Sequence, residues 1–494
     1  YILTVAVSIS AGTAAVTSAL PSVRPFAVEI GVFFILLITL GNLRGIRESG
    51  SIFAAPTYLF VILAFAMIAI GVARAISGDV PAPTIVEPVH SEAVELLSIF
   101  LILKAFASGN AALTGLEAIS DGVPAFQPPE WKNARTTLVW MAILLAILFL
   151  GISFLAVQFT ILPSTSETVI SQLGRVAFGT ETPVYYLFQA ATVMILVLAA
   201  NTAFSDFPRL CYFLARDRFL PSLFQFRGER LAFTTGILSL AIVASILVVV
   251  FQADTHALIP LYAVGVFLSF TLSQSGMVMR WWRKREPGWR TGLPINAVGA
   301  FATGMVTIVV ATEKFSAGAW MVILLIPILV FMLQSINAHY VAVADELAIE
   351  DLTQSAPEKP LPPVVLVPVP NLNRASLRTL SFAHSISDDV TALFVTDDLS
   401  TADALRKRWT QWEGETPLVV LESPYRSLTA PLIAYVDAQR EQHPNRTILV
   451  VLGEFVPRHW WEWLLHGQSA LRLKAALFFR PNVVVADVAY HLTK

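Results

Sequence analysis

The residues best suited to do chemistry lie in an apolar stretch, ASGNAALTGLEAISDG, at residues 107–122. Glu117 follows Thr114 by three residues, so both side chains fall on one face of a helix. Gly109 and Gly115 weaken that helix, because glycine leaves helical geometry without steric cost. Where a membrane helix unwinds, freed carbonyls and half-helix ends bind ions or substrates. We therefore predict a cation or substrate site here; the alternative is a hydrated carboxylate near the inner interface, with glycines for close helix packing.

Further oxygen-bearing side chains occur in other apolar segments. Tyr1, Thr4 and Ser8 have the spacing of a single helical stripe in the run YILTVAVS. The competing interpretation is that such hydroxyls bond to their own helix backbone, which is common in membrane spans. Tyr262 lies in ALIPLYAVGVF, where the proline and glycine favour a locally irregular helix. It is a candidate oxygen ligand or gate, or else an interfacial aromatic residue.

One further charge lies in the segment that contains Glu117. Lys104 precedes it by a little over three turns, and an intramembrane charge requires a partner, a water cavity or a route to the interface. Its partner cannot be read from the sequence, and a direct role in transport is one alternative.

Enzymatic motifs are absent from the sequence. It contains no GxSxG, HExxH or GxxxxGK[ST] pattern, so we predict no catalytic residues and no cofactor. The single cysteine, Cys211, excludes an internal disulfide and a thiolate metal cluster. The formal net charge of -2 argues against a nucleic-acid partner.

Composition shows what must position these residues. The chain of 494 residues is 55% hydrophobic and only 14% charged, whereas soluble domains carry about 25% charged residues. Most of it must therefore be solvated by membrane lipid. We expect ten membrane-crossing segments, at about residues 1–20, 26–43, 52–76, 95–118, 134–159, 183–214, 231–251, 257–279, 294–311 and 318–338.

Loop charges orient these segments. An even number of crossings puts both ends on one side, and thirteen basic residues then fall in the loops of that side against four in the loops of the other. The positive-inside rule makes the basic side cytoplasmic, so the C-terminal part lies in the cytoplasm. The cluster RWWRKREPGWR places Trp281, Trp282 and Trp289 at a headgroup boundary.

The composition changes after residue 338. Residues 339–362 are polar and then proline-rich, which is typical of a linker. Beyond them, β-branched runs alternate with amphipathic stretches, which predicts a parallel sheet covered by helices. We therefore expect a transporter domain at 1–338 and a cytoplasmic α/β domain at 363–494. Its strands are expected at Val364–Val369, Thr391–Thr396, Pro417–Glu422, Thr447–Leu452 and Asn482–Val488.

Several of these motifs carry a family resemblance. ALTGLEAISDGVPAFQPPEWKNAR resembles a signature of the APC superfamily of transporters. Together with YILTVAVSIS, NLRGIRESG and EFVPRHWWEWLLHGQSALRLK, it resembles the KUP-related, KimA-type potassium importers over essentially the whole chain. The resemblance implies twelve helices in an inverted repeat, of which the first two are missing here and residues 95–118 form a broken helix. The soluble part resembles the universal-stress-protein fold.

The resemblance also implies a function and a site. The chain would be a multi-pass protein of the cell membrane that imports potassium by proton symport, with Glu117 as the proton-coupling residue. The potassium ligands would be Tyr1, Thr4, Ser8, Thr114, Glu117 and Tyr262. It further implies regulation by cyclic di-AMP and a homodimer formed through the cytoplasmic domains. The alternatives are a proton-coupled amino-acid permease and a membrane-anchored sensor without flux.

Overall fold

We describe a computed structural model of the chain, which divides into two compact units, Tyr1–Ala348 and Ile349–Lys494. The structure describes residues 1–44, 50–78, 101, 102, 105, 109, 119, 122, 123, 126–164, 166–180, 182–226, 233–348, 361–412, 414–423, 429–456 and 469–491.

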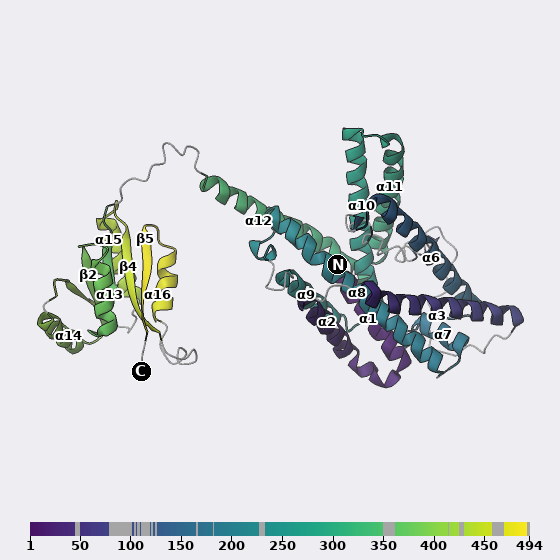
Figure 1. Cartoon of the computed structure of the whole chain (residues 1–494), viewed down its shortest axis with the longest axis horizontal. Helices are drawn as coiled ribbons and strands as arrows, with labels where there is room; N and C mark the ends of the chain where they lie inside the picture. The colour runs from purple at the N-terminus through teal and green to yellow at the C-terminus, as the bar shows by residue number, and fades with distance from the viewer. Residues whose placement is uncertain are drawn as a thin grey trace. The chain divides into compact units, whose positions relative to one another are not determined.

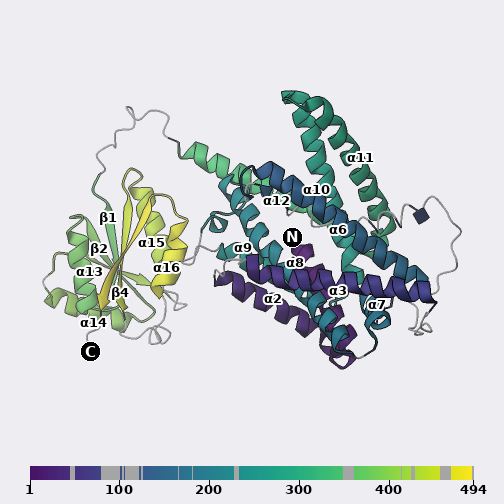
Figure 2. The same cartoon turned by 45° about the vertical axis from the view of Figure 1, so that its right-hand side comes forward.

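The first unit is built of helices (Figures 1 and 2). Among the described residues, eight helices are long and apolar enough to cross a membrane, and α9 is a shorter apolar helix. Segment 95–118 lies largely outside the described residues, so the expected count of ten is not tested. The helices are α1 Ile2–Ala19, η1 Pro21–Phe26, α2 Ala27–Leu43, α3 Gly50–Ser77, α6 Glu130–Gln158, α7 Val169–Phe178, α8 Pro183–Arg216, η4 Ser222–Phe224, α9 Thr234–Val250, α10 Thr255–Lys284, α11 Trp289–Glu313, η5 Phe315–Ala319 and α12 Trp320–Glu346.

Helix α1 is the centre of this unit. It packs against α2, α8, α9 and α10, and its Val5 and Ile9 are fully buried in a cluster shared with α2, α8 and α9. A polar contact reinforces the apolar one, since Asn42 of α2 donates a 2.8 Å hydrogen bond to Asn201 of α8. Such interhelical bonds add about 0.6 kcal/mol each in membrane proteins.

Two further pairs of neighbouring helices belong to this unit. Gly71 of α3 and Gly151 of α6 allow close packing, because a Cβ at either would come within 2.7 Å of a side chain on the other helix. Helices α10 and α11 form a long antiparallel pair that runs side by side in both views (Figures 1 and 2). Thr271 of α10 donates a 3.0 Å hydrogen bond to Thr303 of α11. The pair ends in a short connection around Gly288, whose φ of 92° suits glycine.

The second unit is a five-stranded sheet with helices. Every pair of neighbouring strands is parallel, and their order is β3-β2-β1-β4-β5. The elements are β1 Val364–Pro368, α13 Arg374–His384, β2 Val390–Thr396, α14 Leu399–Gln411, β3 Leu418–Glu422, α15 Thr429–Gln442, β4 Ile448–Val456, α16 Ser469–Phe478 and β5 Val483–His491. The five expected strands are all present.

The sequence explains this arrangement locally. Residues Val364–Val367 of the central strand β1 are buried, with successive side chains contributing to two separate apolar clusters. A strand covered on both faces is apolar throughout, as the run VVLVP is. Asn373 and Asp398 cap α13 and α14 by accepting backbone hydrogen bonds from Ser376 and Ser400.

Candidate functional site

The predicted hydroxyl stripe lies at the start of α1. Tyr1 is the N-cap of the helix, and Thr4 and Ser8 follow within it. All three are partly buried, whereas the neighbouring Val5 and Ile9 are fully buried. Tyr1 packs against the same apolar cluster as Val5 and Ile9, so the stripe borders the face of α1 that packs against α2 and α9.

Tyr262 lies on a helix that packs directly against α1. Leu3 of α1 contacts the apolar cluster that contains Leu261 and Val264 of α10, so this part of α10 packs near the first turn of α1. Helix α10 continues through Pro260 from Thr255 to Lys284. Because proline lacks an N–H, one backbone carbonyl in the first turns of α10 loses its helical partner. The stripe and Tyr262 thus lie on two helices that pack against each other, and their joint role as ligands stays a prediction.

The remaining predicted site residues lie outside the described residues. These are Thr114 and Glu117 of the glycine-containing segment and the nearby Lys104. Their proposed roles stay predictions from the sequence.

A polar network joins α1, α7 and α8, and the sequence did not reveal it. Glu167 accepts hydrogen bonds from Ser171 Oγ at 2.6 Å and from Arg175 Nε at 2.7 Å. Ser171 Oγ also shares a 2.7 Å hydrogen bond with Tyr185 of α8, and Arg175 donates to the carbonyl of Ser18 at the end of α1. We call these five residues the outer network, because loop charges assign this end of the helices to the outer side.

Electrostatics strengthens the outer network. Helix α7, of ten residues, is too short to cross a membrane. Burial of Arg175 by itself would lower the pKa of its guanidinium, but Glu167 and Tyr185 outweigh burial and raise it. The sequence contained one signal for this helix: Thr168 is a residue type that caps helices, and Arg175 falls on the same helical face as Glu167. From the sequence, Arg175 counted only as a charge of an outer loop.

Among the described residues, five have a buried side-chain polar atom without a hydrogen-bond partner: Ser10, Thr13, Gln189, Thr255 and Trp281. Ser10, Thr13 and Gln189 are at most 2% exposed, and their side-chain polar atoms have no partner. Thr13 Oγ1 lies 3.5 Å from where a Cβ on Gly31 of α2 would be. Thr13 therefore faces the core, away from the predicted stripe.

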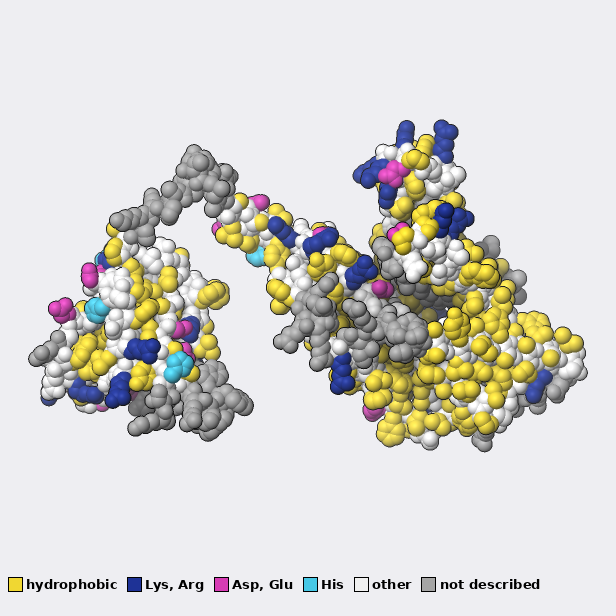
Figure 3. Space-filling model, viewed as in Figure 1, with side chains coloured by type: hydrophobic (Ala, Val, Ile, Leu, Met, Phe, Trp, Pro, Cys, Tyr) yellow, Lys and Arg dark blue, Asp and Glu magenta, His cyan; other side chains and the backbone are white. Residues whose placement is uncertain are grey.

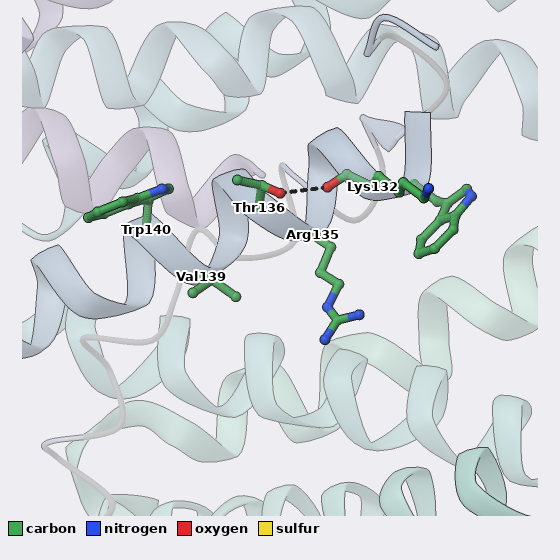
Figure 4. Close-up of a pocket in the computed structure, with 6 residues that line it drawn as sticks. Lys132, Arg135, Thr136, Val139 and Trp140 are labelled. Atoms are coloured by element: carbon green, nitrogen blue, oxygen red, sulfur yellow. Dashed lines mark hydrogen bonds between the residues drawn. The ribbon is translucent and has the colours of Figure 1, made fainter. Parts of the chain in front are cut away.

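A pocket lies along the first turns of α6 (Figure 4). Its volume is about 380 Å³, and Arg135 extends away from the helix while Thr136 bonds to the carbonyl of Lys132. Two cations and no carboxylate stand among the described residues that line it, so its potential repels a cation. The described lining therefore does not favour potassium binding. Its lining residues are Trp131, Lys132, Arg135, Thr136, Val139 and Trp140.

Comparison with known proteins matches both units. Residues 1–333 match the family described as amino acid permease. Residues 361–490 match the KimA potassium transporter C-terminal domain. The chain is 42% identical over 503 aligned residues to the protein named potassium transporter KimA of Bacillus subtilis (strain 168), and the alignment covers 100% of this chain and 81% of that protein.

Proposed function

Because the chain belongs to the family of the potassium transporter KimA, we propose that it imports potassium across the cytoplasmic membrane by proton symport. The family makes it a multi-pass membrane transporter with a C-terminal soluble domain, and not an enzyme.

The set of neutral oxygens on α1 and α10 is the observation that supports potassium as the substrate. Tyr1, Thr4 and Ser8 are partly buried, and α1 packs against the helix that carries Tyr262. Potassium is a large, hard cation that suits a cage of neutral oxygens with few charges. Three hydroxyls in one stripe and a fourth on an adjoining helix supply such oxygens without the cost of several buried charges.

Proton coupling is assigned to Glu117. A carboxyl group away from water favours its protonated form, whereas a neighbouring cation favours its ionised form. In symport the proton and potassium must cross together, so Glu117 would stay protonated while neutral oxygens hold potassium, and would release its proton on the cytoplasmic side, where potassium also leaves. Thr114, on the same helical face, would complete the ligand set, and rocking of one helix bundle against the other would alternate access.

The C-terminal unit is assigned to regulation. Its match to the KimA C-terminal domain supports this role, and the excess of basic loop residues supports a cytoplasmic location. We propose that two chains associate through this unit and that cyclic di-AMP binds it. The parallel sheet supports such binding in general terms, since its strand order, β3-β2-β1-β4-β5, is the one common in nucleotide-binding folds.

A second candidate function is proton-coupled amino-acid transport, favoured by the match of residues 1–333 to the amino acid permease family. The hydroxyl stripe favours the ion, because amino-acid substrates require partners for both a carboxylate and an ammonium group. A sensor without flux would not need the hydroxyl groups of α1 and α10 as cation ligands.

Uptake into proteoliposomes distinguishes these functions. The full chain should take up potassium, faster with an inward proton gradient, and should not take up labelled amino acids. Glu117→Gln should retain the fold and lose the acceleration by the proton gradient. Uptake by Glu117→Gln with unchanged pH dependence would refute the coupling role, and amino-acid uptake without potassium flux would refute the substrate.

A further inference from the structure

The tip of the α10–α11 hairpin carries a dense positive charge. Residues 280–290 contain five Lys or Arg and one carboxylate, Glu286. Glu286 is paired with Arg280 at 3.0 Å. No carboxylate among the residues that the structure describes pairs with the other four cations, which are Arg283, Lys284, Arg285 and Arg290. Figure 3 shows the basic side chains gathered at the free end of this hairpin.

Aromatic contacts hold part of this charge in place. The guanidinium carbons of Arg285 and Arg290 lie 5.6 Å and 5.8 Å from the ring centroid of Trp289. Trp281 packs closely on α11, since a Cβ on Gly292 would lie 2.6 Å from its indole. The side chains around the connection are therefore restrained before any ligand binds, which lowers the entropy cost of binding.

Helix length places the tip in the headgroup layer. Helix α10 has 30 residues and α11 has 25, which correspond to about 45 Å and 38 Å at 1.5 Å per residue. The hydrocarbon core is about 30 Å thick, and the bilayer with its headgroups about 40–45 Å. Both helices are thus longer than the hydrocarbon core is thick, so the connection between them reaches the headgroup layer. Trp282, 62% exposed, and Met279, 48% exposed, present apolar surface beside the cations.

We propose that this tip binds anionic phospholipid headgroups of the leaflet it faces. Arginine pairs with phosphate oxygens in a bidentate geometry, and exposed indoles favour the same interfacial layer. A free anion would use the cations alone, whereas a lipid also covers Trp282 and Met279. The surface therefore fits a negatively charged lipid and neither a zwitterionic lipid nor a soluble phosphate.

The test compares lipids on the purified full chain. Lipid-depleted protein is mixed with phosphatidylglycerol or phosphatidylcholine, and the lipids retained are counted by native mass spectrometry. The wild-type chain should retain phosphatidylglycerol preferentially. The triple variant Arg283→Gln, Lys284→Gln and Arg290→Gln should lower that preference by about a hundredfold, because each of the three basic residues contributes about fivefold at an anionic surface. Added salt should weaken the wild-type preference.

Two further variants make the result specific. A control that removes three exposed cations from the soluble domain, Arg378→Gln, Arg406→Gln and Lys407→Gln, should leave the preference unchanged. The double variant Arg283→Lys and Arg290→Lys keeps the charge and should retain most of the preference for phosphatidylglycerol. The proposal is overturned if the triple variant keeps the wild-type preference or if the soluble-domain control loses as much. It is also overturned if inorganic phosphate displaces the retained lipid at equal concentration. The same holds if the lysine variant loses the preference as fully as the triple variant.

Discussion

The outer network allows a quantitative prediction about stability. Glu167→Gln removes the charge that accepts hydrogen bonds from Ser171 and Arg175 at 2.6 Å and 2.7 Å. A hydrogen bond to a charged group contributes about 1.5–3 kcal/mol. The Glu167 side chain is only 15% exposed, so water cannot fully replace the hydrogen bonds that the substitution weakens. Arg175 is 30% exposed and recovers part of its hydration. The expected loss in free energy of unfolding is therefore about 1–2 kcal/mol.

The assay is thermal unfolding of the full chain in lipid nanodiscs. A loss of this size should lower the Tm by about 2–6 °C. A matched control is Asp217→Asn, which breaks the ion pair with Arg216, whose side chains are 54% and 57% exposed. Exposed pairs contribute about 0–1 kcal/mol, so this control should hardly move the Tm. A double-mutant cycle with Arg175→Gln should give a coupling energy of about 1 kcal/mol.

The reasoning would be refuted if Glu167→Gln were as neutral as Asp217→Asn. It would also be refuted if Glu167→Gln and Arg175→Gln were destabilising but additive. That result would mean that the two side chains act separately and that the network does not couple α7 to α1.

Two further predictions concern single side chains. Asp437 in α15 accepts hydrogen bonds from Arg480 at 3.0 Å and 3.2 Å and from Arg440, and these lower the pKa of its carboxyl group. A lowered folded-state pKa gives stability that is present above the unfolded value near 3.9 and is lost as the pH falls through the folded value. The free energy of opening of α15, measured by amide exchange in the full chain, should therefore fall more steeply below about pH 4 than in Asp437→Asn. The difference should be about 0.5–1 kcal/mol, since the carboxylate is 36% exposed and screened. Identical acid profiles of the two proteins would contradict this. Thr13→Val removes a buried hydroxyl that lacks a partner, so it should keep or raise the Tm by up to about 2 °C, and a clear fall would show that the hydroxyl has a partner, such as an internal water.

Hydropathy located the helices better than it located their ends. Helices α10 and α12 run to Lys284 and Glu346, beyond the apolar ends expected at residues 279 and 338. The reason is that hydropathy marks the hydrocarbon layer, whereas backbone hydrogen bonding continues the helix into the headgroups. Helix α7 was missed because its ten residues cannot span a membrane, and hydropathy marks only segments that can.

The soluble domain was easier to predict, with one instructive difference. Apolar β-branched runs gave the start of each strand within about a residue, but β4 and β5 extend to Val456 and His491. Their ends pair with each other, from Gly453 with Val488 to Val456 with His491. The length of a strand therefore depends on its neighbour, and a pattern read along one segment does not contain that information.

The candidate site was predictable only as a periodicity. Spacing placed Tyr1, Thr4 and Ser8 on one face of a helix, and the structure adds that all three are partly buried. The sequence could not say which face of α1 packs, because Thr13 and Ser10 are also polar and are fully buried on it. The outer network depends on contacts between Ser18 and residues more than 140 positions away, which no local pattern encodes.

The most direct test of the account compares one substitution at two positions of α1. Thr4→Val removes a hydroxyl from the proposed ligand stripe, and Thr13→Val removes one from the buried face of the same helix. Potassium uptake by the full chain in proteoliposomes should show a KM about tenfold higher for Thr4→Val, equivalent to about 1.4 kcal/mol of lost binding, and an unchanged KM for Thr13→Val. Equal values of KM in the two variants would contradict the assignment of potassium to this face of α1.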